Sequence, residues 1–88
     1  MTGFGKRDGR GKKSKPQQKL KPSGESHLKD AIKYHIRGEL INAERGYRKA
    51  IKIGCYDHIA FTNLGVICKS SGRPEEAILL FKKAIELN

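Results

Sequence analysis

The sequence repeats itself at an offset of 34 positions between residues 24 and 88. Five pairs of identical residues carry the repeat: Gly38 and Gly72, Ala43 and Ala77, Lys49 and Lys83, Ala50 and Ala84, and Ile51 and Ile85. Aromatic residues also coincide, since Tyr47 aligns with Phe81. Five identities are few, but most fall at small positions, which control how closely two helices pack. We therefore expect two copies of one structural unit.

Within each copy the apolar residues recur every three or four positions, which is the spacing of helices and not of strands. The apolar-periodic region begins near Ser26. Asp57 is a good N-cap for a helix that stops at Ser71-Gly72, and Pro74 suits the first position of the next helix. Glu75 and Glu76 follow, where they complement the helix dipole. We predict an all-α fold of four helices in two hairpins, residues 24–57 and 58–88.

The second unit resembles the tetratricopeptide repeat, a 34-residue helix-turn-helix unit. The residues that carry the resemblance are Phe61-x-x-Leu64-Gly65-x-x-Cys68, Gly72 and Ala77-x-x-x-Phe81-x-x-Ala84. The first unit matches less completely through Ala31-x-x-Tyr34, Gly38 and Ala43-x-x-x-Tyr47-x-x-Ala50. His27 and Asp30 stand where the family has its aromatic residue and its leucine. The resemblance implies the start of a right-handed α-solenoid and a module that binds other proteins.

The resemblance also places a binding surface, because the first helices of successive repeats line a concave face in this family. Asn63 stands one residue before Leu64, at the place where the family often has an asparagine that bonds the backbone of a ligand. The expected groove residues are Asn63, Ile59, Val66 and Lys69 from the second unit, and Ile32 and His35 from the first. Lys69 beside His35 would favour an acidic ligand group. The alternative for Asn63 is an asparagine on a helix surface that faces water.

Residues 1–22 differ sharply from the rest in charge. They hold eight basic residues against one acid, a net charge of +7, with four glycines and two prolines. So few large apolar side chains cannot offset the entropy of ordering, and we expect a disordered basic tail. The tail from Lys6 to Lys21 would contact nucleic acid or an acidic protein, or it would serve only to keep the chain in solution.

The pattern offers little for catalysis or metal binding. Cys55-x-x-His58 has the spacing of half a zinc site, but no second pair completes four ligands. Cys68 is best interpreted as a small buried apolar residue, and two cysteines are too few for a disulfide scaffold. Without a phosphate loop or a nucleophile in a plausible catalytic setting, we expect a protein that is not an enzyme and has no metal or cofactor. Without a signal sequence or a membrane span, we expect a cytoplasmic location.

The last helix raises a further expectation. Stacked repeats leave an apolar face for the next unit, and a polar helix usually covers the last one. No such helix follows Ile85 and Leu87. We therefore expect a fragment of a longer array, or self-association through the last helix. Two alternative functions stay open: a basic protein that binds nucleic acid or the ribosome, and the N-terminal segment of a multidomain transferase, as in certain bacterial tetratricopeptide proteins.

Overall fold

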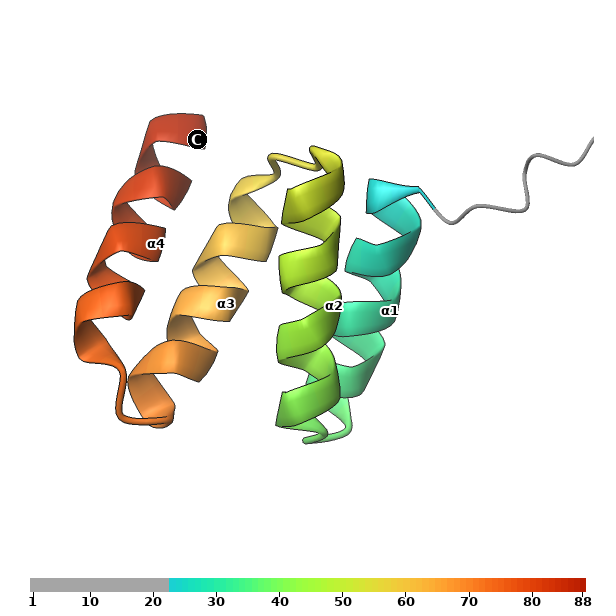
Figure 1. Ribbon diagram of the computed structural model, residues 1–88, viewed down its shortest axis with the longest axis horizontal. Coiled ribbons are helices and arrows are strands. Elements are labelled where there is room, and N and C mark those ends of the chain that lie inside the picture. Colours follow the sequence, from blue (N-terminus) through green and yellow to red (C-terminus); the bar gives the residue numbers. More distant parts are fainter. Residues whose placement is uncertain (1–22) are drawn as a thin grey trace, which may run out of the picture.

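Four α-helices make up residues 23–88, which are the residues that the computed structural model describes. The helices are α1 (Gly24–Ile36), α2 (Leu40–Ile53), α3 (His58–Ser70) and α4 (Pro74–Leu87), and this part of the chain contains no strand. They lie side by side in chain order, with α1 and α3 running in one direction and α2 and α4 in the other (Figure 1). The predicted all-α fold of two hairpins is confirmed. The expected disorder of residues 1–22 lies outside the described residues.

Local signals account for where the helices begin and end. The carboxylate of Asp57 accepts a hydrogen bond of 2.8 Å from the N–H of Ile59, and Pro74 is the first residue of α4, both as predicted. α1 begins at Gly24, close to the start of the apolar pattern near Ser26, and the hydroxyl of Ser23 caps it by accepting a 3.0 Å bond from the Ser26 N–H. The turns after α1 and α3 use glycines at φ values of 80° and 78°, which are Gly38 and Gly72.

Each hairpin is closed by small residues at the helix crossing. Ala31 and Ala43 are fully buried between α1 and α2, and Gly65 and Ala77 are buried between α3 and α4, as the repeat pattern predicts. α1 and α2 also approach each other closely at Gly46, where an added Cβ would lie 2.7 Å from the Cβ of Ala31. An added Cβ at Gly65 would meet the ring of Phe81 at the same distance. Both hairpins therefore depend on a missing side chain.

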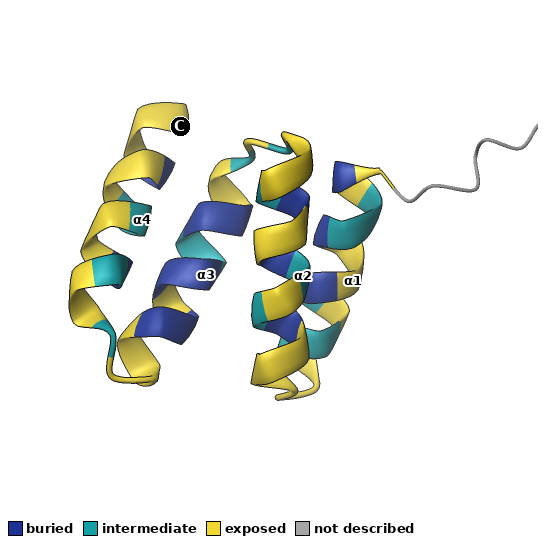
Figure 2. Cartoon of the chain, viewed as in Figure 1, coloured by how far each residue is buried: buried dark blue, intermediate teal, exposed yellow. Residues whose placement is uncertain are grey.

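The two hairpins share one apolar core, because α2 packs against α3. Tyr47 of α2 and Leu64, Ile67 and Cys68 of α3 are its largest fully buried side chains. Buried residues line the facing sides of α1, α2 and α3, whereas most of α4 is exposed (Figure 2). The outer surface of α4 presents large apolar side chains to solvent: Ile78, Leu79 and Ile85.

Candidate functional site

The hydroxyl of Tyr47 joins the first helices of both hairpins. Tyr47 has no exposed surface, and its phenol oxygen accepts a 3.0 Å hydrogen bond from the side-chain amide of Asn63 on α3. The same oxygen lies 3.0 Å from Nδ1 of His35 on α1. When Nδ1 carries no proton, the phenol hydroxyl donates to it. His35 and Asn63, which the sequence placed in one groove, are therefore held together by a residue of the second helix.

The surroundings of Tyr47 keep its hydroxyl neutral. Burial raises the pKa of Tyr47 above its usual value of 10.0, and the bond from Asn63 offsets only part of this rise. The ring of His35 meets the ring of Tyr47 edge to face, with centroids 5.8 Å apart. Both contacts fix the imidazole and the amide at the seam between the hairpins. Asn63 uses one amide hydrogen in this way and keeps its carbonyl oxygen and second amide hydrogen for other partners.

The other predicted groove residues lie on the same two helices. Ile32 and Val66 occupy equivalent positions 34 residues apart, as do His35 and Lys69. α1 and α3 run in the same direction (Figure 1), and the two members of each pair hold the same position along their helices. Ile59 and Val66 are 40% and 45% exposed, and Lys69 is also exposed. Ile32 packs partly against the core.

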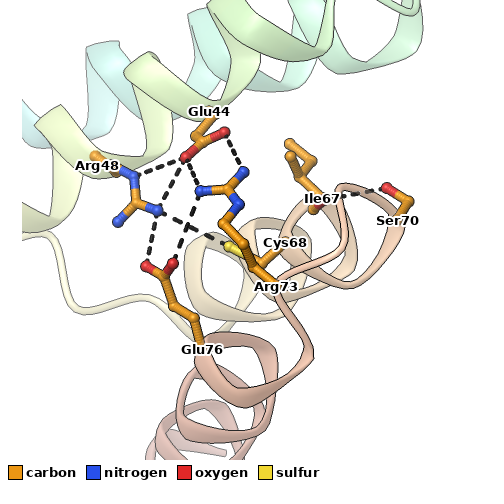
Figure 3. Close-up of polar contacts among 7 residues, drawn as sticks. All are labelled: Glu44, Arg48, Ile67, Cys68, Ser70, Arg73 and Glu76. Carbon is orange, nitrogen blue, oxygen red and sulfur yellow. Dashed lines mark hydrogen bonds and ion pairs between the residues drawn. The ribbon is translucent and has the colours of Figure 1, made fainter.

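A second polar cluster links the hairpins at the side of α2 that faces the turn between α3 and α4 (Figure 3). Both terminal nitrogens of Arg73 donate to the carboxylate of Glu44, each at 2.8 Å. Arg48 donates to Glu44 at 3.0 Å and to Glu76 at 2.7 Å. We call Glu44, Arg48, Arg73 and Glu76 the ionic clamp. A bidentate arginine-carboxylate pair fixes geometry better than a single contact does, so the clamp sets how the second hairpin sits on the first.

The clamp changes the protonation equilibrium of its central acid. Hydrogen bonds from Arg73, opposed by partial burial and reinforced by Arg48, lower the pKa of Glu44 from 4.5 to about 2. The sequence reasoning missed this cluster and assigned Glu76 to the helix dipole alone. The spacing of Glu44 and Arg48, four residues apart on one helix, was the available signal. The partners across the hairpins depend on how the units stack, which no local pattern reveals.

The cysteines and histidines of the described residues are dispersed. Cys55 lies half-buried after α2, Cys68 is fully buried, and both are free thiols. Burial raises the pKa of each thiol. Between residues 23 and 88 no three side chains of His, Cys, Asp or Glu gather as metal ligands would. None of α1 to α4 has the length and apolar character needed to cross a membrane.

Comparison with known protein families identifies the second hairpin. Residues 58–88, which form α3 and α4, match the family model described as tetratricopeptide repeat. No significant match was found among curated proteins or among solved structures. The first hairpin lies outside the matched residues, but it has the same order of helices and the same glycine turn. The α3–α4 hairpin thus matches a tetratricopeptide repeat, a unit typical of protein-protein interaction modules, and the α1–α2 hairpin before it has the same helix-pair architecture.

Proposed function

We propose that this protein is a non-catalytic interaction module that binds an extended peptide or a partner helix across α1 and α3. The observation that carries the proposal is the position of Asn63. Its amide is fixed at the seam of the two hairpins by Tyr47, and the exposed side chains of Ile59 and Val66 flank it on the same helix face. A polar group held between two apolar contacts is the arrangement that anchors a peptide backbone.

Each residue of the proposed groove has a distinct role. The free carbonyl and the second N–H of Asn63 bond one peptide unit of the ligand, whatever its side chain. Ile59 and Val66 bury apolar ligand side chains, with Ile32 continuing this surface on α1. Lys69 and His35 stand at the same end of their parallel helices and favour an acidic group of the ligand there. The net charge of +10 speeds encounter with acidic partners.

The test begins with a random peptide library displayed on phage and selected against the full chain. A selected peptide is synthesised with a fluorescent label, and its dissociation constant is measured by anisotropy. Asn63→Ala removes the backbone contact and is expected to weaken binding about fivefold or more. Val66→Ser removes apolar contact and is expected to weaken binding to a similar degree, about fivefold.

The matched control is Lys82→Ala, an exposed residue on α4 outside the proposed groove. It should bind the peptide as the unmodified protein does. Circular dichroism of each variant establishes that the helices are intact. The proposal is wrong if the selected peptides bind with unchanged affinity to both groove variants, or if backbone amide shifts caused by the peptide map to α2 and α4 instead of α1 and α3.

A further inference from the structure

α2 carries a row of cations on the side opposite its buried residues. Arg45, Lys49 and Lys52 follow the spacing of one helix face, and all three are exposed. The buried positions of the same helix, Ala43, Tyr47 and Ala50, point the other way. We call Arg45, Lys49 and Lys52 the basic face of α2. It belongs to neither the proposed groove nor the core.

The basic face differs from the ionic clamp on the same helix. Arg48 and Arg73 are each bonded to carboxylates, so their charge is compensated within the protein. Among residues 23–88, by contrast, no carboxylate lies within ion-pair distance of Arg45, Lys49 or Lys52. Asp30 of α1 lies near Arg45 and Lys49 without forming an ion pair. The positive potential of this face therefore extends into solvent.

An open hollow adjoins the basic face between α1 and α2, with Gly46 among the residues that line it. The other residues that line it are His27, Asp30 and Tyr34 of α1 and Asn42, Arg45 and Lys49 of α2. The hollow thus brings an aromatic ring and an imidazole beside two cations, one carboxylate and a side-chain amide, so the cations outnumber the acid. Cations beside an aromatic ring are typical of sites that bind single-stranded nucleic acid, because the phosphates pair with the cations and an unpaired base stacks on the ring.

The first residue of α1 lies beside the C-terminal end of α2, where the basic face ends at Lys52. Gly24, the first residue of α1, packs against the end of α2 so closely that an added Cβ would lie 2.7 Å from the Cβ of Cys55. Lys52 is in the last turn of α2. Residues 1–22, with their eight basic residues, are therefore joined covalently to the fold next to the basic face.

We propose that the basic face of α2 and the adjoining hollow bind single-stranded nucleic acid. The basic face holds the phosphate backbone, and Tyr34 stacks one base. An acidic protein is the less suitable partner, because its carboxylates would use the cations and leave the aromatic ring of Tyr34 without a function. The site lies on α2 and the outer side of α1, so nucleic acid and peptide occupy different surfaces.

The test is the affinity of the full chain for a labelled oligouridylate of about twelve nucleotides, measured by anisotropy at several salt concentrations. The triple variant Arg45→Gln, Lys49→Gln, Lys52→Gln is compared with Lys29→Gln, Lys82→Gln, Lys83→Gln. Both triple variants remove three positive charges from exposed helix positions. We expect the first to lower the slope of log affinity against log salt by about 2 and to bind about tenfold more weakly or worse. The second should stay within about twofold of the unmodified protein at low salt.

The stacking contact is tested by Tyr34→Leu, which retains an apolar side chain where Tyr34 packs against the core. We expect it to weaken oligouridylate binding about fivefold or more and to leave the salt slope unchanged. Asn63→Ala, in the proposed peptide groove, should bind the oligonucleotide normally, so the two proposals fail independently.

Three results would overturn the inference. The first is an equal loss of affinity in both triple variants, which would show that only total charge matters. The second is a loss confined to Lys12→Gln, Lys13→Gln, Lys15→Gln, which would place all binding in the segment before α1. The third is equal affinity for an oligoglutamate of the same length with the same dependence on the basic face, which would identify an acidic protein as the partner.

Discussion

The two hairpins have one architecture, but their central aromatic residues have different surroundings. Tyr47 of the first hairpin is fully buried, whereas Phe81, its equivalent 34 residues later, is only partly buried. α3 covers the side of α2 that carries Tyr47, and among the described residues no helix covers α4 in the same way. A hairpin of this kind therefore does not complete its own core. The following hairpin does so.

The comparison extends to polar groups. The hydroxyl of Tyr47 has one neighbour in each hairpin, His35 and Asn63, so stacking also provides its hydrogen bonds. Phe81 has no hydroxyl and needs no such partners. The first hairpin is therefore closed by shape and by hydrogen bonds together, and the second by shape alone.

Truncation of the two aromatic residues should separate the stabilities of the two hairpins most clearly. Tyr47→Ala removes a fully buried ring and is expected to lower the free energy of unfolding by about 3–5 kcal/mol. Phe81→Ala removes a partly exposed ring and should cost about half as much. Urea unfolding followed by circular dichroism measures both, and complete loss of the helical signal in Tyr47→Ala agrees with the prediction. Equal losses would show that stacking adds nothing to the burial of Tyr47.

The glycines at the two crossings provide the next test. Gly46→Ala drives a methyl group against the Cβ and backbone of Ala31, which cannot move without shifting α1. It should cost about 1–3 kcal/mol, more than the gain in helix propensity offsets. Gly65→Ala meets a ring edge of Phe81 that can turn toward solvent, so its cost should stay below about 1 kcal/mol. Thermal unfolding of the two variants gives the order, and the reverse order would contradict it.

Acid should weaken the contact between the two hairpins, because it protonates Glu44 of the ionic clamp. The folded pKa of Glu44 is about 2 and its unfolded value is near 4.5, so its stabilising contribution is complete above about pH 5 and is lost as the pH falls toward 2. Since its arginine partners are partly exposed, we expect a loss of about 1 kcal/mol by about pH 3.

The measurement compares urea unfolding at neutral and acidic pH for the unmodified protein and for Glu44→Gln. The variant lacks the titrating group and should lose about 1 kcal/mol less over the same pH range. Glu86→Gln, on exposed α4, is the control, because Glu86 contacts only Lys83 among the described residues and at 3.6 Å. A pH dependence of Glu44→Gln identical to that of the unmodified protein would rule out the clamp as the acid-sensitive element.

The smallest change in stability is expected when Tyr47 and Phe81 are each replaced by the aromatic residue of the other hairpin. Tyr47→Phe keeps the ring and deprives His35 and Asn63 of their shared partner, at a cost of about 0.5–1.5 kcal/mol. If the hydroxyl also orients Asn63, peptide affinity should fall in this variant while oligouridylate affinity stays constant. The reciprocal Phe81→Tyr adds a hydroxyl at an equivalent position on α4 and should leave stability almost unchanged. Unaltered peptide binding in Tyr47→Phe would remove the positioning role of Tyr47.

The sequence predicted most of the fold, because the elements depend on local signals. Asp57, Gly72 and Pro74 each act within one turn of helix, and the structure confirms all three. Apolar spacing placed the beginning of the first helical run only near Ser26, and the cap at Ser23, which fixes the first turn of α1, was not identified. Gly46 was missed because its equivalent, Leu80, is large, so the repeat comparison gave no indication of a close crossing there.

The candidate site was less accessible to sequence reasoning. His35 and Asn63 were placed on one surface from the resemblance, but their link through Tyr47 needed coordinates, since Tyr47 comes from the second helix. The ionic clamp joins residues 29 positions apart, and its geometry depends on the angle at which one hairpin rests on the other. The remaining groove residues, Ile32, Ile59, Val66 and Lys69, stay a prediction until a ligand is bound.

The ionic clamp also determines which of the two hairpins must come first in the chain. The acid and the arginine at its centre, Glu44 and Arg73, have Ile78 and Glu39 as their equivalents 34 positions away. A protein with the hairpins in exchanged order would bring Ile78 toward Glu39, an apolar side chain toward an acid. The contact between the hairpins is thus directional. The first hairpin offers the acid and the second offers the arginine, and the reversed order would form no such ion pair.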